Sequence, residues 1–174
     1  QVSGREQEVF GLGAEARHQP GTIAYSERLM WDLLQETVDE MARNGIRKII
    51  LVNGHGGNSS FLRYFCQAQL ARRHDYAIFL YQPSPDAEAE ARIKALRKTP
   101  VDEHAGEVET SSMLAHHPDI VHAERAGDQS GADLARLADL KDAYTAIWWY
   151  AKFPNHYGGD ARPANAELGR LVFD

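Results

Sequence analysis

The chain has little of what several classes of protein require. It has one cysteine among 174 residues, so no disulfide can form within it. No uninterrupted apolar run is long enough to span a bilayer, and residues 1–8 are too polar for the apolar segment of a signal peptide. It also lacks an excess of basic charge: the net charge of −6 argues against a general affinity for nucleic acid. We therefore expect a cytoplasmic protein that acts on a small molecule, without a membrane or nucleic-acid partner.

What the chain has is an alternation of helical and strand-like periods, typical of parallel strands joined by helices. The pattern predicts a helix from Ser26 to about Asn44, a strand over 46–52, a helix over 59–73 and a strand over 76–81. The first strand is nearly all apolar, as expected for a parallel strand covered on both faces. Together with the length, this predicts one α/β domain over residues 1–174. A charged helix over 86–98 should form a solvated face.

The segment Asn53-Gly54-His55-Gly56-Gly57-Asn58 joins the first strand to the following helix. Open α/β sheets bind ligands where a strand ends and a helix begins. Glycines let the backbone approach a ligand closely, so Gly56 and Gly57 favour a binding role for His55. Asn53 and Asn58 should hold the loop and orient His55, although asparagines are also common structural residues of turns.

A second segment, 102–114, places His104, Glu107 and Glu109 at the start of a helix. Acids are stabilised near a helix N-terminus, so a well-capped helix with a nearby histidine is one interpretation. The other is a metal site, because imidazole and carboxylate ligands with an open water position are what a catalytic divalent metal requires.

These segments resemble the creatininase family of metal-dependent amidohydrolases. The matching residues are Pro20-Gly21-Thr22, residues 52–58 and residues 104–111, in the family's order and spacing, with weaker similarity in 158–160 and 164–169. The resemblance implies a three-layer α/β/α fold with a central, mainly parallel sheet. It also implies a homo-oligomer such as a hexamer and two divalent metals per subunit, which are zinc, manganese or iron.

The resemblance assigns roles to individual residues. His55 would be a metal ligand, and His104 would contact substrate and pass a proton to the leaving nitrogen. Glu109 matches the acid of the family's Glu-Thr-Ser element and would act in catalysis. The family's namesake enzyme has an acid two residues beyond the loop histidine, where this chain has Gly57; Glu107 is the candidate replacement as a ligand of the second metal.

Residues 1–25 do not reproduce the strand with which the family begins, which carries further metal ligands. We interpret the chain as lacking this first strand and its metal-binding loop; in a complete chain without them, catalysis would be doubtful. The aromatic, turn-rich segment from Trp148 to Asp160 should either line a pocket or form a subunit contact. His156 within it would contact substrate or support groups that do, whereas His116 and His117 should mark a helix end.

The predicted function is hydrolysis of a cyclic or linear non-peptide amide by a metal-activated water. Creatinine itself is not expected, because Pro100 stands where the namesake enzyme has a substrate-binding tryptophan. A ketosugar ring or a peptide is an alternative substrate within the family. Two other classes remain: a degenerate member acting as a binding or assembly subunit, and a loop over 54–58 that binds a phosphate through its backbone N–H groups.

Overall fold

The computed structural model describes residues 13–82 and 86–173, which belong to two compact units. The N-terminal unit is drawn from residues 1–84 and the C-terminal unit from residues 85–174. The polar segment 1–8, and the first twelve of the residues compared with the family's first strand, lie outside the described residues.

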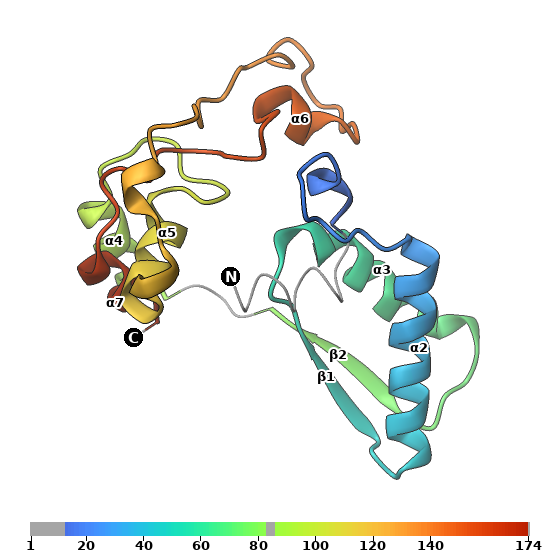
Figure 1. Ribbon diagram of the computed structural model, residues 1–174. Coiled ribbons are helices and arrows are strands. Elements are labelled where there is room, and N and C mark those ends of the chain that lie inside the picture. The colour runs from blue at the N-terminus through green and yellow to red at the C-terminus, as the bar shows by residue number, and fades with distance from the viewer. Residues whose placement is uncertain (1–12, 83–85, 174) are drawn as a thin grey trace. The chain divides into compact units, whose positions relative to one another are not determined.

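The N-terminal unit is a parallel βαβ unit preceded by a long helix (Figure 1). Helix α2, Glu27–Arg43, begins where the Ser26 Oγ accepts a hydrogen bond from the Leu29 N–H at 3.2 Å. The following elements are β1 (Lys48–Val52), η2 (Gly56–Asn58), α3 (Ser59–Ala68), η3 (Gln69–Ala71) and β2 (Ala77–Tyr81). The predicted α/β class and parallel strand pair are confirmed; the second helix is shorter than predicted because its end tightens into the 3-10 turn η3.

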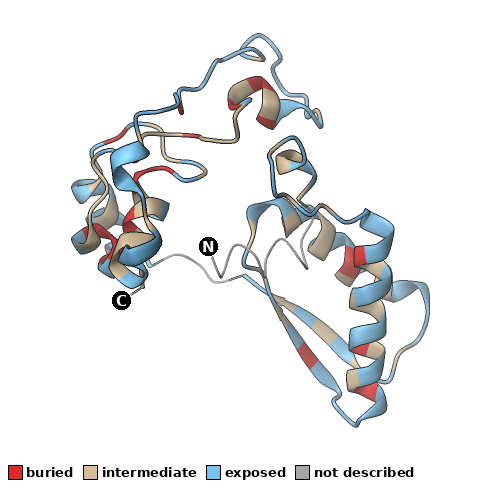
Figure 2. Cartoon of the chain, viewed as in Figure 1, coloured by how far each residue is buried: buried red, intermediate tan, exposed pale blue. Residues whose placement is uncertain are grey.

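The core of this unit lies between the two helices and one face of the sheet. Val38 of α2, Ile49 of β1 and Phe65 of α3 are at most 2% exposed and contact one another. On the other face, Ile50 is 65% and Val52 75% exposed, an alternation that Figure 2 shows along the strand. The expectation that β1 is covered on both faces is therefore wrong within this unit, because its two helices pack on the same face of the sheet.

The C-terminal unit consists of helices and irregular segments (Figure 1). Its helices are α4 (Ala87–Leu96), α5 (Glu107–His116), η4 (Pro118–Ile120), η5 (Ala123–Arg125), α6 (Trp148–Lys152) and α7 (Ala166–Phe173). Helix α4 contains no buried residue, which confirms the predicted solvated face, and α5 ends at His116 as predicted.

Helices α5 and α7 pack closely against each other. Gly169 of α7 faces the backbone of Ser111 on α5, and the Asn165 N–H donates to the buried Ser111 Oγ at 3.0 Å. This contact fixes the helix whose first turn carries Glu107 and Glu109.

Candidate active site

The loop after β1 places His55 between the strand and α3. His55 itself is extended, and its N–H donates to the Asn53 Oδ1 at 3.2 Å. The Asn53 Nδ2 in turn donates to the Ser59 Oγ at 3.3 Å, at the first residue of α3. Asn53 therefore connects the end of the strand, the loop and the start of the helix, and restrains the backbone that carries His55.

An acid that the sequence analysis did not select contacts His55. Glu15, on the 3-10 turn η1 (Ala14–Ala16), places its Oε1 3.3 Å from the His55 Nε2. The two side chains are 26% and 30% exposed. A Cβ atom at Gly57 would lie 2.7 Å from the Glu15 Oε1 and 2.8 Å from the His55 Cε1, so the glycine leaves room for both side chains.

Glu107, the candidate second metal ligand, is fully buried in the C-terminal unit. Its carboxylate accepts hydrogen bonds from the Lys98 N–H at 2.9 and 3.0 Å and from the Thr99 N–H at 2.8 Å. In this structure the carboxylate therefore ties the start of α5 to the segment that follows α4. The ligand role of Glu107 stays a prediction.

His104 lies just before α5 in a tightly held turn. Its Nδ1 is 3.8 Å from the Glu109 Oε2, and the same oxygen accepts the Ala105 N–H at 2.7 Å. Ala105 adopts a left-handed backbone with φ of 55°, which the bond to Glu109 helps to hold. The acid and the imidazole thus come from one short segment and face each other.

His156 lies against His104, with ring centroids 4.1 Å apart. The buried Trp149 donates from its Nε1 to the His156 Nδ1 at 2.8 Å. An indole N–H can only donate, so Nδ1 must be the unprotonated nitrogen and the His156 proton resides on Nε2. The structure brings His104, Glu109 and His156 together, and Trp149 fixes the tautomer of the last.

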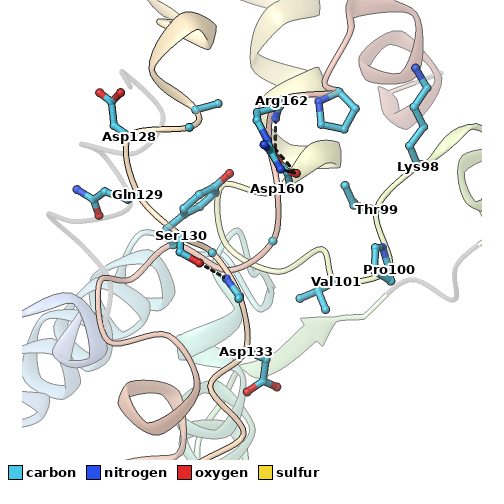
Figure 3. A pocket seen from close by; sticks show the side chains of 17 residues that line it. Lys98, Thr99, Pro100, Val101, Asp128, Gln129, Ser130, Asp133, Asp160 and Arg162 are labelled. Atoms are coloured by element: carbon cyan, nitrogen blue, oxygen red, sulfur yellow. Dashed lines mark hydrogen bonds and ion pairs between the residues drawn. The ribbon is translucent and has the colours of Figure 1, made fainter.

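A cavity of about 1100 Å³ also lies in the C-terminal unit (Figure 3). It is lined by residues 98–101, 126–133, 157, 159–160 and 162–163. The Arg162 guanidinium, 2.6 Å from the Asp160 Oδ2, lowers the pKa of the Asp160 carboxyl. His104, Glu109 and His156 are not among the described residues that line it.

Comparison with known proteins gives the same family as the motifs around His55 and His104. Residues 8–174 match the model of the creatininase family, which is described as creatinine amidohydrolase. The chain belongs to the creatininase family. It is 30% identical over 124 residues to a creatinine amidohydrolase of Pseudomonas putida, covering 66% of this chain and 48% of that protein. It is also 30% identical over 166 residues to a mycofactocin precursor peptide peptidase of Mycobacterium ulcerans (strain Agy99), covering 94% and 59%.

Solved structures support the same fold. A putative creatinine amidohydrolase from Bacteroides fragilis is 26% identical, with a TM-score of 0.68 over 90% of this chain and 60% of that one. A mutant creatininase of Zn-Zn type is 24% identical, with a TM-score of 0.66 over 95% and 64%, and shows the fold alone. The chain spans about half to three fifths of the length of the two curated relatives.

Membership of this family implies a divalent metal. The donor atoms near His55 supply part of the ligand set that such a metal needs. An imidazole nitrogen and a carboxylate oxygen are both zinc ligands, and here they converge on space that a Cβ at Gly57 would fill. Within residues 13–82 and 86–173, however, no group of three or more His, Cys, Asp or Glu side chains could hold a metal. The described residues thus supply two donors.

Sequence reasoning selected His55, His104, Glu109 and His156 but missed Glu15 and Trp149. The short turn around Glu15 has no pattern typical of a site, so only its contact with His55 reveals it. Trp149 stands in an aromatic run for which the sequence predicted a pocket wall or a subunit contact, and the indole hydrogen bond identifies its partner.

Among the described residues, no helix has both the length and the apolar character needed to cross a membrane.

Proposed function

We propose that the chain is part of a metal-dependent amidohydrolase that cleaves a non-peptide amide C–N bond, cyclic or linear. The observation that carries the proposal is the His104 turn, in which an imidazole and a carboxylate face each other within a family of named hydrolases. A divalent metal, when bound, lowers the pKa of a coordinated water and polarises the substrate carbonyl. The substrate is a small molecule, and the active form is a homo-oligomer with two metals per subunit.

In this mechanism His104 supplies the proton that the departing nitrogen needs. Its Nδ1 faces Glu109, so a proton at Nδ1 is held by the carboxylate and Nε2 is the atom that gives a proton to the leaving group. The 3.8 Å separation suits a contact that shortens when substrate binds. Glu109 acts by orienting the ring and by holding the turn through the Ala105 N–H. His55 holds metal in the N-terminal unit.

A peptide bond is the second candidate for the scissile bond. The relative named as a peptide peptidase matches 94% of this chain, against 66% for the relative named as an amidohydrolase. Both bonds are amides, and the same proton donor serves either. A panel of formamides, cyclic amides and short peptides distinguishes them.

The test is hydrolysis of that panel by the purified, zinc- or manganese-loaded protein and two variants. His104→Ala should lower kcat by about 10²- to 10⁴-fold, the usual contribution of a positioned general acid, with metal content unchanged. His122→Ala is the matched control, because His122 is 71% exposed and pairs with Glu124 at 3.2 Å. Equal turnover by His104→Ala and wild type would exclude the proton-donor role. No turnover of any amide by the loaded protein would contradict the proposed function.

A further inference from the structure

We propose that Glu15 is a metal ligand that binds a divalent cation such as Zn²⁺ together with His55. The inference rests on the proposed metal-dependent function and names a residue of its metal site. The pair lies wholly within the N-terminal unit, with Glu15 on η1 and His55 in the loop after β1.

The two donor atoms are separated as two ligands of one zinc ion would be. Zinc binds imidazole nitrogen and carboxylate oxygen at about 2.0–2.2 Å with tetrahedral geometry, which places two donors on one ion about 3.3–3.5 Å apart. The Glu15 Oε1 and the His55 Nε2 are 3.3 Å apart. An ordinary N–H···O hydrogen bond is shorter, about 2.7–3.2 Å. The two atoms are thus already spaced as neighbouring ligands of one ion.

Gly57 lies against both side chains of the pair. Its backbone is not in the left-handed region, so the conformation of the chain does not require glycine at this position. The position of the two side chains favours it, because a Cβ there would approach the Glu15 Oε1 to 2.7 Å and the His55 Cε1 to 2.8 Å, and these side chains would have to move. A side chain at this position would therefore displace the Glu15 carboxylate and the His55 ring from their present contact.

The Glu15 and His55 side chains are accessible to an ion, and the loop that carries His55 is held by hydrogen bonds. Side-chain exposures of 26% and 30% leave Glu15 and His55 partly shielded yet open to an entering ion. Asn53 restrains the loop through the His55 N–H and the Ser59 Oγ, so the imidazole stands on a braced backbone. Supporting hydrogen bonds of this kind position the ligands of metal sites.

Glu15 is also better placed than Glu107 to act in this role, because its carboxylate is partly exposed and already faces His55. The Glu107 carboxylate is fully buried and already accepts three contacts from the backbone N–H groups of Lys98 and Thr99. A cation at Glu107 would have to replace those contacts. Among the described residues, the contact that a cation at Glu15 would replace is the one with His55, and the cation would bind both partners.

The experiment is zinc binding by isothermal titration calorimetry, with bound metal counted by elemental analysis, on the purified full-length protein. Glu15→Gln keeps the shape of the side chain and removes its charge, and Gly57→Ala adds the Cβ that displaces both donors. Glu36→Gln, at an exposed position of α2, is the matched control. Far-ultraviolet circular dichroism and thermal unfolding establish that each variant is folded.

We expect Glu15→Gln and Gly57→Ala to weaken zinc binding by about 100-fold or more, since loss of even a supporting residue costs 10- to 100-fold. Glu36→Gln should bind as wild type does. Wild-type affinity in Glu15→Gln would overturn the inference while leaving the proposed function intact. No zinc binding by wild type would overturn both. If Glu15→Gln does not fold, the ¹³C shift of the Glu15 carboxyl in wild-type protein decides, and its failure to move on zinc addition overturns the inference.

Discussion

Replacing Glu107 tests whether this buried acid stabilises the fold without any metal. The Glu107 side chain is fully buried at the first position of α5, and its two oxygens accept from the Lys98 and Thr99 N–H groups at 2.8–3.0 Å. A hydrogen bond to a charged acceptor contributes about 1.5–3 kcal/mol, and an unsatisfied buried donor costs about 1–3 kcal/mol.

The Lys98 and Thr99 N–H groups differ in whether water can replace the Glu107 carboxylate. Lys98 is exposed, so water can replace the carboxylate at its N–H, whereas Thr99 is 9% exposed and its N–H would stay unsatisfied. We therefore expect Glu107→Ala to lower the free energy of unfolding by about 3 kcal/mol. Glu107→Gln keeps one acceptor oxygen without its charge, and should cost about half as much.

The assay is urea unfolding of protein freed of metal with a chelator, followed by circular dichroism. Glu103→Gln is the control, because Glu103 is exposed in the same segment, and such surface changes stay within about 0.5 kcal/mol. If Glu107 served only as a metal ligand, metal-free Glu107→Ala would be as stable as the control variant. That result would refute the reasoning.

Two further predictions concern stability. Gly169→Ala should lower the free energy of unfolding by several kcal/mol, because its Cβ would overlap the backbone carbonyl of Ser111. Gly127→Ala is the control and should be nearly neutral, because its Cβ would meet the Arg162 side chain at 4.0 Å. Equal melting temperatures of the two variants would contradict the packing of α5 on α7. The Tyr76 hydroxyl donates to Asp39 at 2.7 Å and lowers the pKa of that carboxyl, so its stabilisation is present above about pH 4 and lost as the pH falls below it. Tyr76→Phe should cost about 1 kcal/mol near pH 7, and the difference from wild type should shrink toward pH 2. A constant difference would argue against a hydrogen bond from the Tyr76 hydroxyl to an ionised Asp39 carboxylate.

Local signals predicted the elements of the N-terminal unit well. Ser26 caps α2 because a hydroxyl before an apolar-periodic run satisfies the N–H groups of the first turn. The strand, the glycine-rich loop and the next helix follow one another without a break, so their order alone placed His55 after β1. What this pattern did not predict is the exposure of Ile50 and Val52, because covering a second face depends on which elements pack there.

The candidate site was predicted in part for the same reason. His104 and Glu109 meet because they share one turn and one helix start, a distance that spacing along the chain can define. Trp149 bonds to His156 where His156 adopts a left-handed backbone with φ of 66°, a conformation uncommon for a residue other than glycine. The role of Trp149 therefore could not be predicted from residue type and spacing.

The sequence by itself determined the family, the α/β class and the two segments that carry His55 and His104, because these depend on local periodicity and on motifs that are contiguous in the chain. Only the tertiary structure decided which acid stands beside His55 and which one is buried in the fold. Glu15 reaches His55 from a distant turn through space left by Gly57, while Glu107 turns inward to backbone N–H groups. A carboxylate has the same identity in both places, and its surroundings decide what it binds.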